Sequence, residues 1–257
     1  MIGSFIRRLL RGEVARPIPE PLWQETLTAL PFLARLDADE LARLRSLAEQ
    51  FLAEKEFSTA GPLELSDAMC VSIAVQGCLP ILNLGLDHYR GWVGIVVYPD
   101  EFVIPRSIQD EDGIVHEYDE VASGEAWGGG PLLVSWRDVQ MAGEGYNVVI
   151  HEFAHKLDME NGEADGIPPL PPGISREVWD RTLLDAYEDF CVELDAADEA
   201  GLDTEIDPYA AEHPGELFAV LSELFFEQPE LVQRRFPEFH ALLARFYRID
   251  LANRTTG

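Results

Sequence analysis

Basic residues, and lysine above all, are scarce in this sequence. Its 257 residues include 19 Lys and Arg against 47 Asp and Glu, a formal net charge of −28, and the only lysines are Lys55 and Lys156. A chain this acidic repels nucleic acid unless it carries a local basic patch, and the sequence shows none. Direct binding to nucleic acid is therefore not expected.

Cysteine is also rare, and long hydrophobic runs are missing. Cys70, Cys78 and Cys191 are odd in number and lack C-x-x-C spacing, so neither a disulfide framework nor a cysteine zinc cage is expected. Reduced thiols favour a cytoplasmic location. No apolar run approaches the roughly 20 residues that cross a bilayer, so stable membrane insertion is not expected. Residues 1–12 carry arginines where a secretory signal would be apolar; a packed terminus or a short amphipathic helix fits them.

The acidic residues are unevenly distributed. Residues 160–230 contain 20 Asp and Glu, with Arg176 and Arg181 as their only basic residues. Such a segment is either a solvated acidic face or a surface that selects basic partners or substrates.

Helical and β-rich patterns occupy separate regions of the chain. Leucines at spacings of three to five predict helices over 22–56, with a break at 36–40 and an N-cap at Asp37 or Asp39. This order predicts an α+β fold in one domain over 1–257: a helical N-terminal region (1–60), a helix plus sheet (61–145), and an active-site helix with C-terminal helices (146–257). The further expected helices are 65–82, 147–158, 175–193, 215–226 and 237–247, and the expected strands are 91–99, 102–105, 114–123 and 131–136.

The stretch YNVVIHEFAHKLDMENG, residues 146–162, carries the clearest chemistry. His151 and His155 are four residues apart, so on a helix they share one face and can hold one Zn²⁺. Glu152 lies on an adjoining face, where it can accept a proton from metal-activated water. Because H-E-x-x-H arises by chance in roughly one or two of a hundred such chains, the motif alone is a hypothesis. The alternative is two ordinary histidines of a core or surface.

A catalytic zinc needs a third protein ligand and an open position. His88 and His116 precede the motif at spacings that favour neither, and position 161 is Asn, which argues against the compact three-histidine pattern and for a glutamate ligand. Residue spacing alone does not choose among the downstream candidates, which are Glu212, His213, Glu216 and Glu223.

Several segments together resemble the Mlc titration factor A (MtfA) family of zinc peptidases. They are GYNVVIHEFAHKLDMENG, PGELFAVLSELFFEQP, DAMCVSIAVQGCLPILNLGLDHYRGWVGIVVYPDEF, SGEAWGGGPLLVSWRDV and FPEFHALLARFYRID, and the resemblance runs from about residue 20 to 250. It implies a zincin-like fold of the gluzincin type, similar to the catalytic domain of anthrax lethal factor. It also implies His151, His155 and Glu216 as zinc ligands and Glu152 as the general base.

The resemblance implies two further roles. Tyr209, seven residues before Glu216, would lie near the metal and could donate a hydrogen bond to the developing oxyanion; the alternative is a packed aromatic at a helix edge. Glu223 would orient a histidine or tyrosine from behind the ligands. An exposed acid is the alternative for Glu223.

Zinc peptidases commonly align a peptide along a free sheet edge, and residues 131–136, PLLVSW, are the expected edge strand, with an interior strand as the alternative. The resemblance implies an aminopeptidase-like zinc enzyme acting on short peptide or aminoacyl substrates. It also implies binding to a glucose-responsive transcriptional repressor of the Mlc type. The alternative function is a non-catalytic regulator-binding, anti-repressor protein with a structural zinc, and a fold that has lost catalysis is a third reading.

Overall fold

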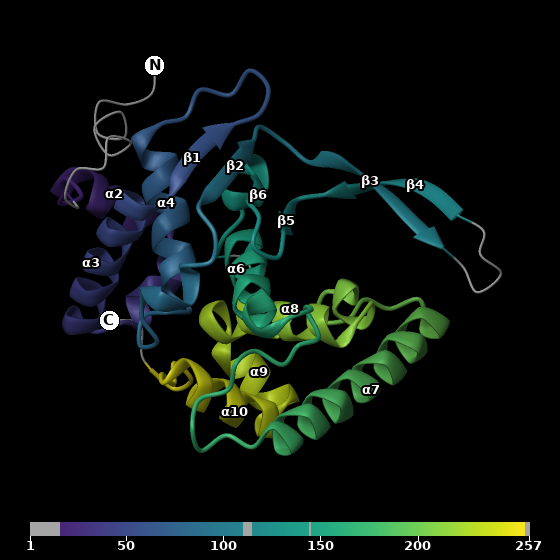
Figure 1. The fold of residues 1–257 in the computed structure, drawn as a ribbon. Helices are drawn as coiled ribbons and strands as arrows, with labels where there is room; N and C mark the ends of the chain where they lie inside the picture. Colours follow the sequence, from purple (N-terminus) through teal and green to yellow (C-terminus); the bar gives the residue numbers. More distant parts are fainter. Residues whose placement is uncertain (1–15, 110–114, 144, 255–257) are drawn as a thin grey trace.

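A computed structural model describes residues 16–109, 115–143 and 145–254; the stretch 1–12, where a packed terminus or a short helix is expected, lies outside them. Figure 1 shows helices to the left of a small sheet and below it, with a two-stranded ribbon reaching away from the sheet to the right. In the described ranges no helix is both long and apolar enough to span a membrane. The architecture is mixed α and β, as the segregation of sequence patterns predicts.

Polar side chains cap two helices of the N-terminal region, one of them at the expected Asp37. Asp37 caps α3: its side chain accepts from the backbone N–H of Glu40, whose carboxylate accepts from the N–H of Asp37 in return. Ser66 caps α4 by accepting from Met69 N–H. The helices of this region are α2 (Glu20–Ala29), η1 (Pro31–Arg35), α3 (Ala38–Glu54) and α4 (Asp67–Cys78).

The sheet is mixed and has the strand order β1-β2-β6-β5. Three strands are parallel, and β5 pairs with β6 in the antiparallel sense. The expectation that residues 131–136 form the edge is wrong, because β6 lies between β2 and β5 and all four of its residues are buried. The edge strand next to β6 is β5, which lies beside the helix over residues 148–158. The strands are β1 (Glu56–Thr59), β2 (Gly94–Tyr98), β5 (Gly124–Ala126) and β6 (Leu132–Ser135).

Strand β1 also corrects the expectation that the N-terminal region is helical throughout. Residues 56–59 follow α3 and pair with β2. The end of the region 1–60, which was expected to be helical, is therefore part of the sheet. Its four residues are too few to show a period in the sequence. Two short helices flank the neighbouring strands: η2 (Leu86–Tyr89) precedes β2, and α5 (Trp136–Val139) follows β6.

Strands β3 (Phe102–Gln109) and β4 (Val115–Ala122) form the ribbon that extends from the sheet. Among the described strands they pair with each other alone, in an antiparallel register from Phe102↔Ala122 to Gln109↔Val115. One residue, Ser123, separates β4 from the edge strand β5. The ribbon and the edge strand therefore follow one another along the chain.

Helices build the C-terminal half. Proline occupies the first position of α8, α9 and α10, where its missing N–H removes no helical hydrogen bond. Gly201 ends α7 in the left-handed conformation that favours glycine. The elements are α6 (Val148–Asp158), η3 (Met159–Asn161), α7 (Arg176–Ala200), η4 (Pro208–Ala211), α8 (Pro214–Glu227), α9 (Pro229–Arg235) and α10 (Pro237–Tyr247).

Helix α6 runs through the middle of the molecule, with every residue buried (Figure 1). Its Phe153 ring packs against Phe51, Tyr89 and Trp92, with ring centres 5.1 to 5.7 Å apart. On α4, a β-carbon at Gly77 would lie 2.4 Å from this ring, so only glycine lets α4 approach α6 this closely. Packing on several sides gives α6 a rigid position.

Candidate metal centre

The start of α6 is held by two carboxylates from α8. Asn147 caps the helix by accepting from Ile150 N–H at 2.9 Å. Its own backbone N–H donates to Glu223 at 2.6 Å, and its side-chain amide donates to Glu227 at 2.8 Å. The first turn of α6, which carries His151, therefore has its position set by α8.

The start of α8 is equally constrained. His213 caps this helix by accepting from Gly215 N–H through Nδ1 at 3.0 Å. A β-carbon at Gly215 would lie 2.4 Å from the carbonyl oxygen of Ala164, so the chain needs glycine here. The next residue, Glu216, projects toward α6.

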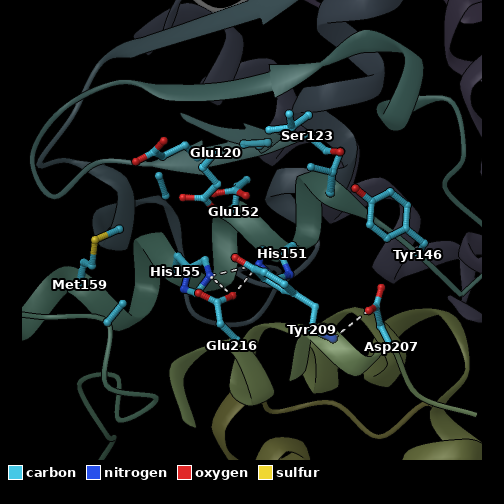
Figure 2. Close-up of a pocket in the computed structure, with 17 residues that line it drawn as sticks. Glu120, Ser123, Tyr146, His151, Glu152, His155, Met159, Asp207, Tyr209 and Glu216 are labelled. Atoms are coloured by element: carbon cyan, nitrogen blue, oxygen red, sulfur yellow. Dashed lines mark hydrogen bonds and ion pairs between the residues drawn. The ribbon is translucent and has the colours of Figure 1, made fainter. Parts of the chain in front are cut away.

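Figure 2 shows the side chains of His151, His155 and Glu216 converging. The Nε2 atoms of the two histidines are 3.1 Å apart, and each is 3.1 Å from Oε2 of Glu216. Ligands at about 2.0–2.1 Å from a tetrahedral zinc are about 3.3 Å from one another. In the described residues these three side chains form the one group of His, Cys, Asp or Glu with metal-binding spacing.

Hydrogen bonding directs the free electron pair of His151 at this centre. Its Nδ1 lies 2.7 Å from Oε1 of Glu223, and a carboxylate there accepts the Nδ1 proton. Nε2 then carries a lone pair and faces the oxygen of Glu216. Two acceptors 3.1 Å apart repel each other unless a proton or a metal cation lies between them. The donor set thus fits a divalent cation.

The same contacts set the pKa values of His151 and Glu216 when no metal is bound. Burial opposes charging of His151, but hydrogen bonds with Glu216 and Glu223 prevail and raise its pKa well above its usual value. Burial would raise the pKa of Glu216 too, yet the two histidines lower it well below its ordinary range. The cluster thus favours an anionic Glu216 beside positive charge.

Glu152 lines a cleft of about 440 Å³ together with the three converging side chains. Its side chain is buried, and burial raises the pKa of its carboxyl to about 7. Edge strand β5 passes directly above it: a β-carbon at Gly124 would lie 2.5 Å from Oε1 of Glu152. The carboxylate therefore lies between the converging side chains and the sheet edge (Figure 2).

Two tyrosines also line the cleft. Tyr209 comes from η4, its ring centre lies 6.0 Å from that of His151, and 38% of the residue is exposed. Tyr146 lies at the end of the cleft near Ser123 (Figure 2). Burial raises the pKa of both phenols above the usual value, and nearby carboxylates add to the shift for Tyr209. Both hydroxyls keep their protons at neutral pH and can donate hydrogen bonds.

The structure separates the candidates for a third ligand. Glu216 joins the histidines, while Glu223 lies behind His151 on the side away from the cleft. His213 is the helix cap and Glu212 does not belong to the cluster. His88 pairs with Glu160 at 2.7 Å. The side chain of His116 lies outside the described residues.

Sequence reasoning did not find several residues that shape this centre. Asn147 and Glu227 form the cap at the start of α6, and Gly124 gives Glu152 its room. Lys156, on α6, donates to the carbonyl oxygens of Trp127, Gly130 and Pro131, the turn between β5 and β6. Signals existed for two of them: Asn147 is a preferred N-cap residue directly before the apolar run Val148–Ile150, and positions 216, 223 and 227 form one stripe along a helix.

The family model for "Glucose-regulated metallo-peptidase M90" matches residues 6–248. The chain belongs to this metallopeptidase family. Relatives include Mlc titration factor A of Salmonella arizonae, which is 42% identical over 238 residues and covers 91% of this chain and 92% of the relative. The proteins of the same name from Salmonella paratyphi B and Salmonella typhimurium are each 41% identical over 237 residues, covering 90% of this chain and 87% of each relative.

Membership of the M90 family agrees with the resemblance inferred from the motifs. A metallopeptidase needs a metal, and His151, His155 and Glu216 form the group that could hold it among the described residues.

Proposed function

We propose that this member of the M90 family is a zinc-dependent, aminopeptidase-like peptidase with a zincin-like fold in one catalytic domain. One observation carries the proposal: Nε2 of His151, Nε2 of His155 and Oε2 of Glu216 are mutually 3.1 Å apart, at the mouth of a cleft that also contains Glu152. These three side chains would hold the zinc. When bound, zinc lowers the pKa of a coordinated water and polarises a substrate carbonyl.

Three side chains, those of Glu152, Tyr209 and Glu223, then have separate roles in proton transfer and hydrogen bonding. Glu152, whose pKa of about 7 suits a general base near neutrality, takes a proton from the attacking water and delivers it to the leaving amine. Tyr209 keeps its phenolic proton and donates a hydrogen bond to the oxygen on which negative charge develops. Glu223 holds the Nδ1 proton of His151 and so keeps Nε2 directed at the metal.

Edge strand β5 would align the peptide. In the antiparallel ladder Ser123 accepts from Ser135 N–H and Trp127 donates to Pro131. Because ladder bonds alternate, the N–H and C=O groups of Gly124 and Ala126 point away from β6, toward the cleft. Glu120, Glu125 and Asp207 line the cleft, and neither Lys nor Arg is among its described lining residues. This acidic lining supports the binding of a substrate that carries a free α-amino group.

The decisive experiment compares the zinc-loaded parent with Glu152→Gln on alanyl-anilide and short peptide substrates. The variant should keep zinc at one ion per chain, because Glu152 is not a ligand, while kcat falls by about three orders of magnitude or more. Glu212→Gln, a nearby glutamate outside the cluster, is the control and should hydrolyse at the parental rate. Equal activity of Glu152→Gln and the parent would refute the general-base role.

A second candidate function is the binding of a transcriptional repressor of the Mlc type, because the relatives are named Mlc titration factors. The purified repressor homologue from the source organism would be tested against the parent and Glu152→Gln. Binding by both proteins, with release of the repressor from its operator, would support a regulatory role that does not need hydrolysis. The absence of binding at micromolar concentrations would exclude it.

A further inference from the structure

The wall of the cleft formed by the sheet edge is one uninterrupted piece of chain. Seven consecutive residues, Glu120 to Ala126, line it. Side chains in a strand alternate between two faces, so a cavity beside one face would be lined by every second residue. A continuous run means that the chain presents its backbone edge to the cleft.

The strand pairing agrees with this geometry. Within the described residues, β5 is the last strand of its sheet and β4 pairs with β3 alone. Each strand therefore has one edge without a neighbouring strand, and the run from Glu120 to Ala126 places these edges along the same cleft. Figure 1 shows the ribbon continuing outward from β5 to the right, above α8 and α7.

The two ends of this edge differ. Beyond Ala126 the chain turns back into β6: Trp127 bonds to Pro131, Gly130 bonds to Trp127, and Lys156 holds the turn from below. Before Gly124 the described residues 115–123 contain no such turn, and the edge continues through Ser123 into the ribbon strand β4, whose residues Ala122 to Glu120 also line the cleft. The edge thus extends much further from the reaction centre in one direction.

The reaction centre lies at Gly124, the residue in closest approach to Glu152. A peptide that adds antiparallel to β5, the more stable pairing, has its N-terminal portion beside Ala126 and its C-terminal portion beside Ser123 and the ribbon. Room for about two residues remains before the scissile bond, while at least about four can pair after it, at about 3.3 Å each.

We infer that the substrates are polypeptides cut near the N-terminus, whose extended C-terminal portion pairs with the edge formed by residues 120–126. This rests on the proposed peptidase function and narrows its substrate class: the ribbon is part of the binding site, and aminoacyl compounds and dipeptides are incomplete ligands. It also explains the aminopeptidase-like preference by the path of the protein backbone: the turn at Trp127 ends the edge, so few substrate residues can pair on the N-terminal side of the scissile bond.

The test is a length series on the zinc-loaded protein. Peptides with one, two, four and six residues after the scissile bond should show kcat/KM rising about tenfold to a hundredfold up to four residues and then levelling, mostly through KM. Lengthening on the N-terminal side should give no gain. A flat C-terminal series, or a gain from N-terminal extension instead, would overturn the inference.

Fluorescence anisotropy with the same peptides and zinc-loaded Glu152→Gln measures how tightly the edge of residues 120–126 binds a peptide that is not hydrolysed. Single N-methyl groups along the peptide backbone should weaken binding at every second position, because alternate amides bond to a strand edge. Uniform effects at all positions would refute strand pairing. If no peptide is hydrolysed by the parent but the alternating pattern remains, the peptidase proposal fails and the peptide-binding edge stands.

Discussion

Gly124 and Glu152 lie so close that a β-carbon on the glycine would be 2.5 Å from the Oε1 atom of the glutamate. The same β-carbon would lie 2.7 Å from Val148 on α6. The sheet edge and α6 are therefore in contact at Glu152, the residue proposed as general base, and a side chain at position 124 would displace its carboxylate.

Gly124→Ala should lower kcat about a hundredfold while zinc content stays at one ion per chain, because a displacement of about 1 Å has that scale of effect. Steady-state kinetics and metal analysis check this. Gly128→Ala is the matched control in the same segment: its β-carbon would meet Met159 at 3.8 Å, an ordinary contact, so parental kinetics are expected. Parental kinetics for Gly124→Ala would contradict the close approach.

Glu223→Gln should weaken zinc binding about 10- to 100-fold. The glutamine can still accept from His151 or from Asn147 N–H, but it has one acceptor oxygen in place of two and no charge. Competition with a chelator of known affinity measures the loss. Glu212→Gln should stay within about twofold of the parent, and an equal loss in both variants would show that the effect is not specific to the His151 contact.

Lys156→Met should raise KM for peptides about tenfold, with zinc content unchanged. The ammonium group donates to three carbonyls of the β5–β6 turn. Without these hydrogen bonds the edge strand along which the peptide binds is held less rigidly. Lys55→Met is the matched control: this lysine also donates to backbone carbonyls, including Trp92 at 2.6 Å, and lies over the same tryptophan ring, but its carbonyl partners precede β2 and do not belong to the turn that follows β5. Both variants should lose stability, about 2 kcal/mol for carbonyls left without donors, and only Lys156→Met should change KM.

Stability should depend on pH through Lys55. Burial lowers its pKa to about 8, against an ordinary value near 10.5, so between these values the unfolded chain binds more protons than the folded one. The contribution of Lys55 to the free energy of unfolding therefore increases from pH 8 to 10.5. The free energy of unfolding is measured with urea for the parent and Lys55→Met over this pH range. It should rise with pH more steeply in the parent than in the variant, because the other titrating groups are common to both proteins and cancel in the difference. A constant difference would refute the shift.

Removal of the metal should lower the thermal midpoint. A ligand at 100 times its Kd stabilises the native state by about 2.7 kcal/mol, which corresponds to roughly 5–10 °C for a chain of this size. Calorimetry of the chelated protein with and without added zinc checks this. His151→Ala should show no response to zinc; a full response in that variant would place the metal elsewhere.

The general shape of the fold was predictable from local patterns. Leucine spacing, polar caps and prolines located the helices, and the break before α3 falls at Asp37 as expected, because capping depends on residues three positions apart. Strand β1 and the edge strand β5 were missed. Both have only three or four residues, too few to show a local period, and β1 also pairs with a strand 38 positions away (Glu56 with Gly94).

The sequence by itself determined that His151 and His155 share a helix face, since four residues make about one turn, and that Glu152 lies beside them. The resemblance singled out Glu216. Only the tertiary structure decided which strand borders the cleft, that Glu223 contacts a histidine and not a tyrosine, and which glycine leaves room for Glu152. Those relationships join residues as far as 76 positions apart, such as Asn147 and Glu223, and depend on how helices and strands pack together. Packing is a property of the whole core, which no short stretch of sequence contains.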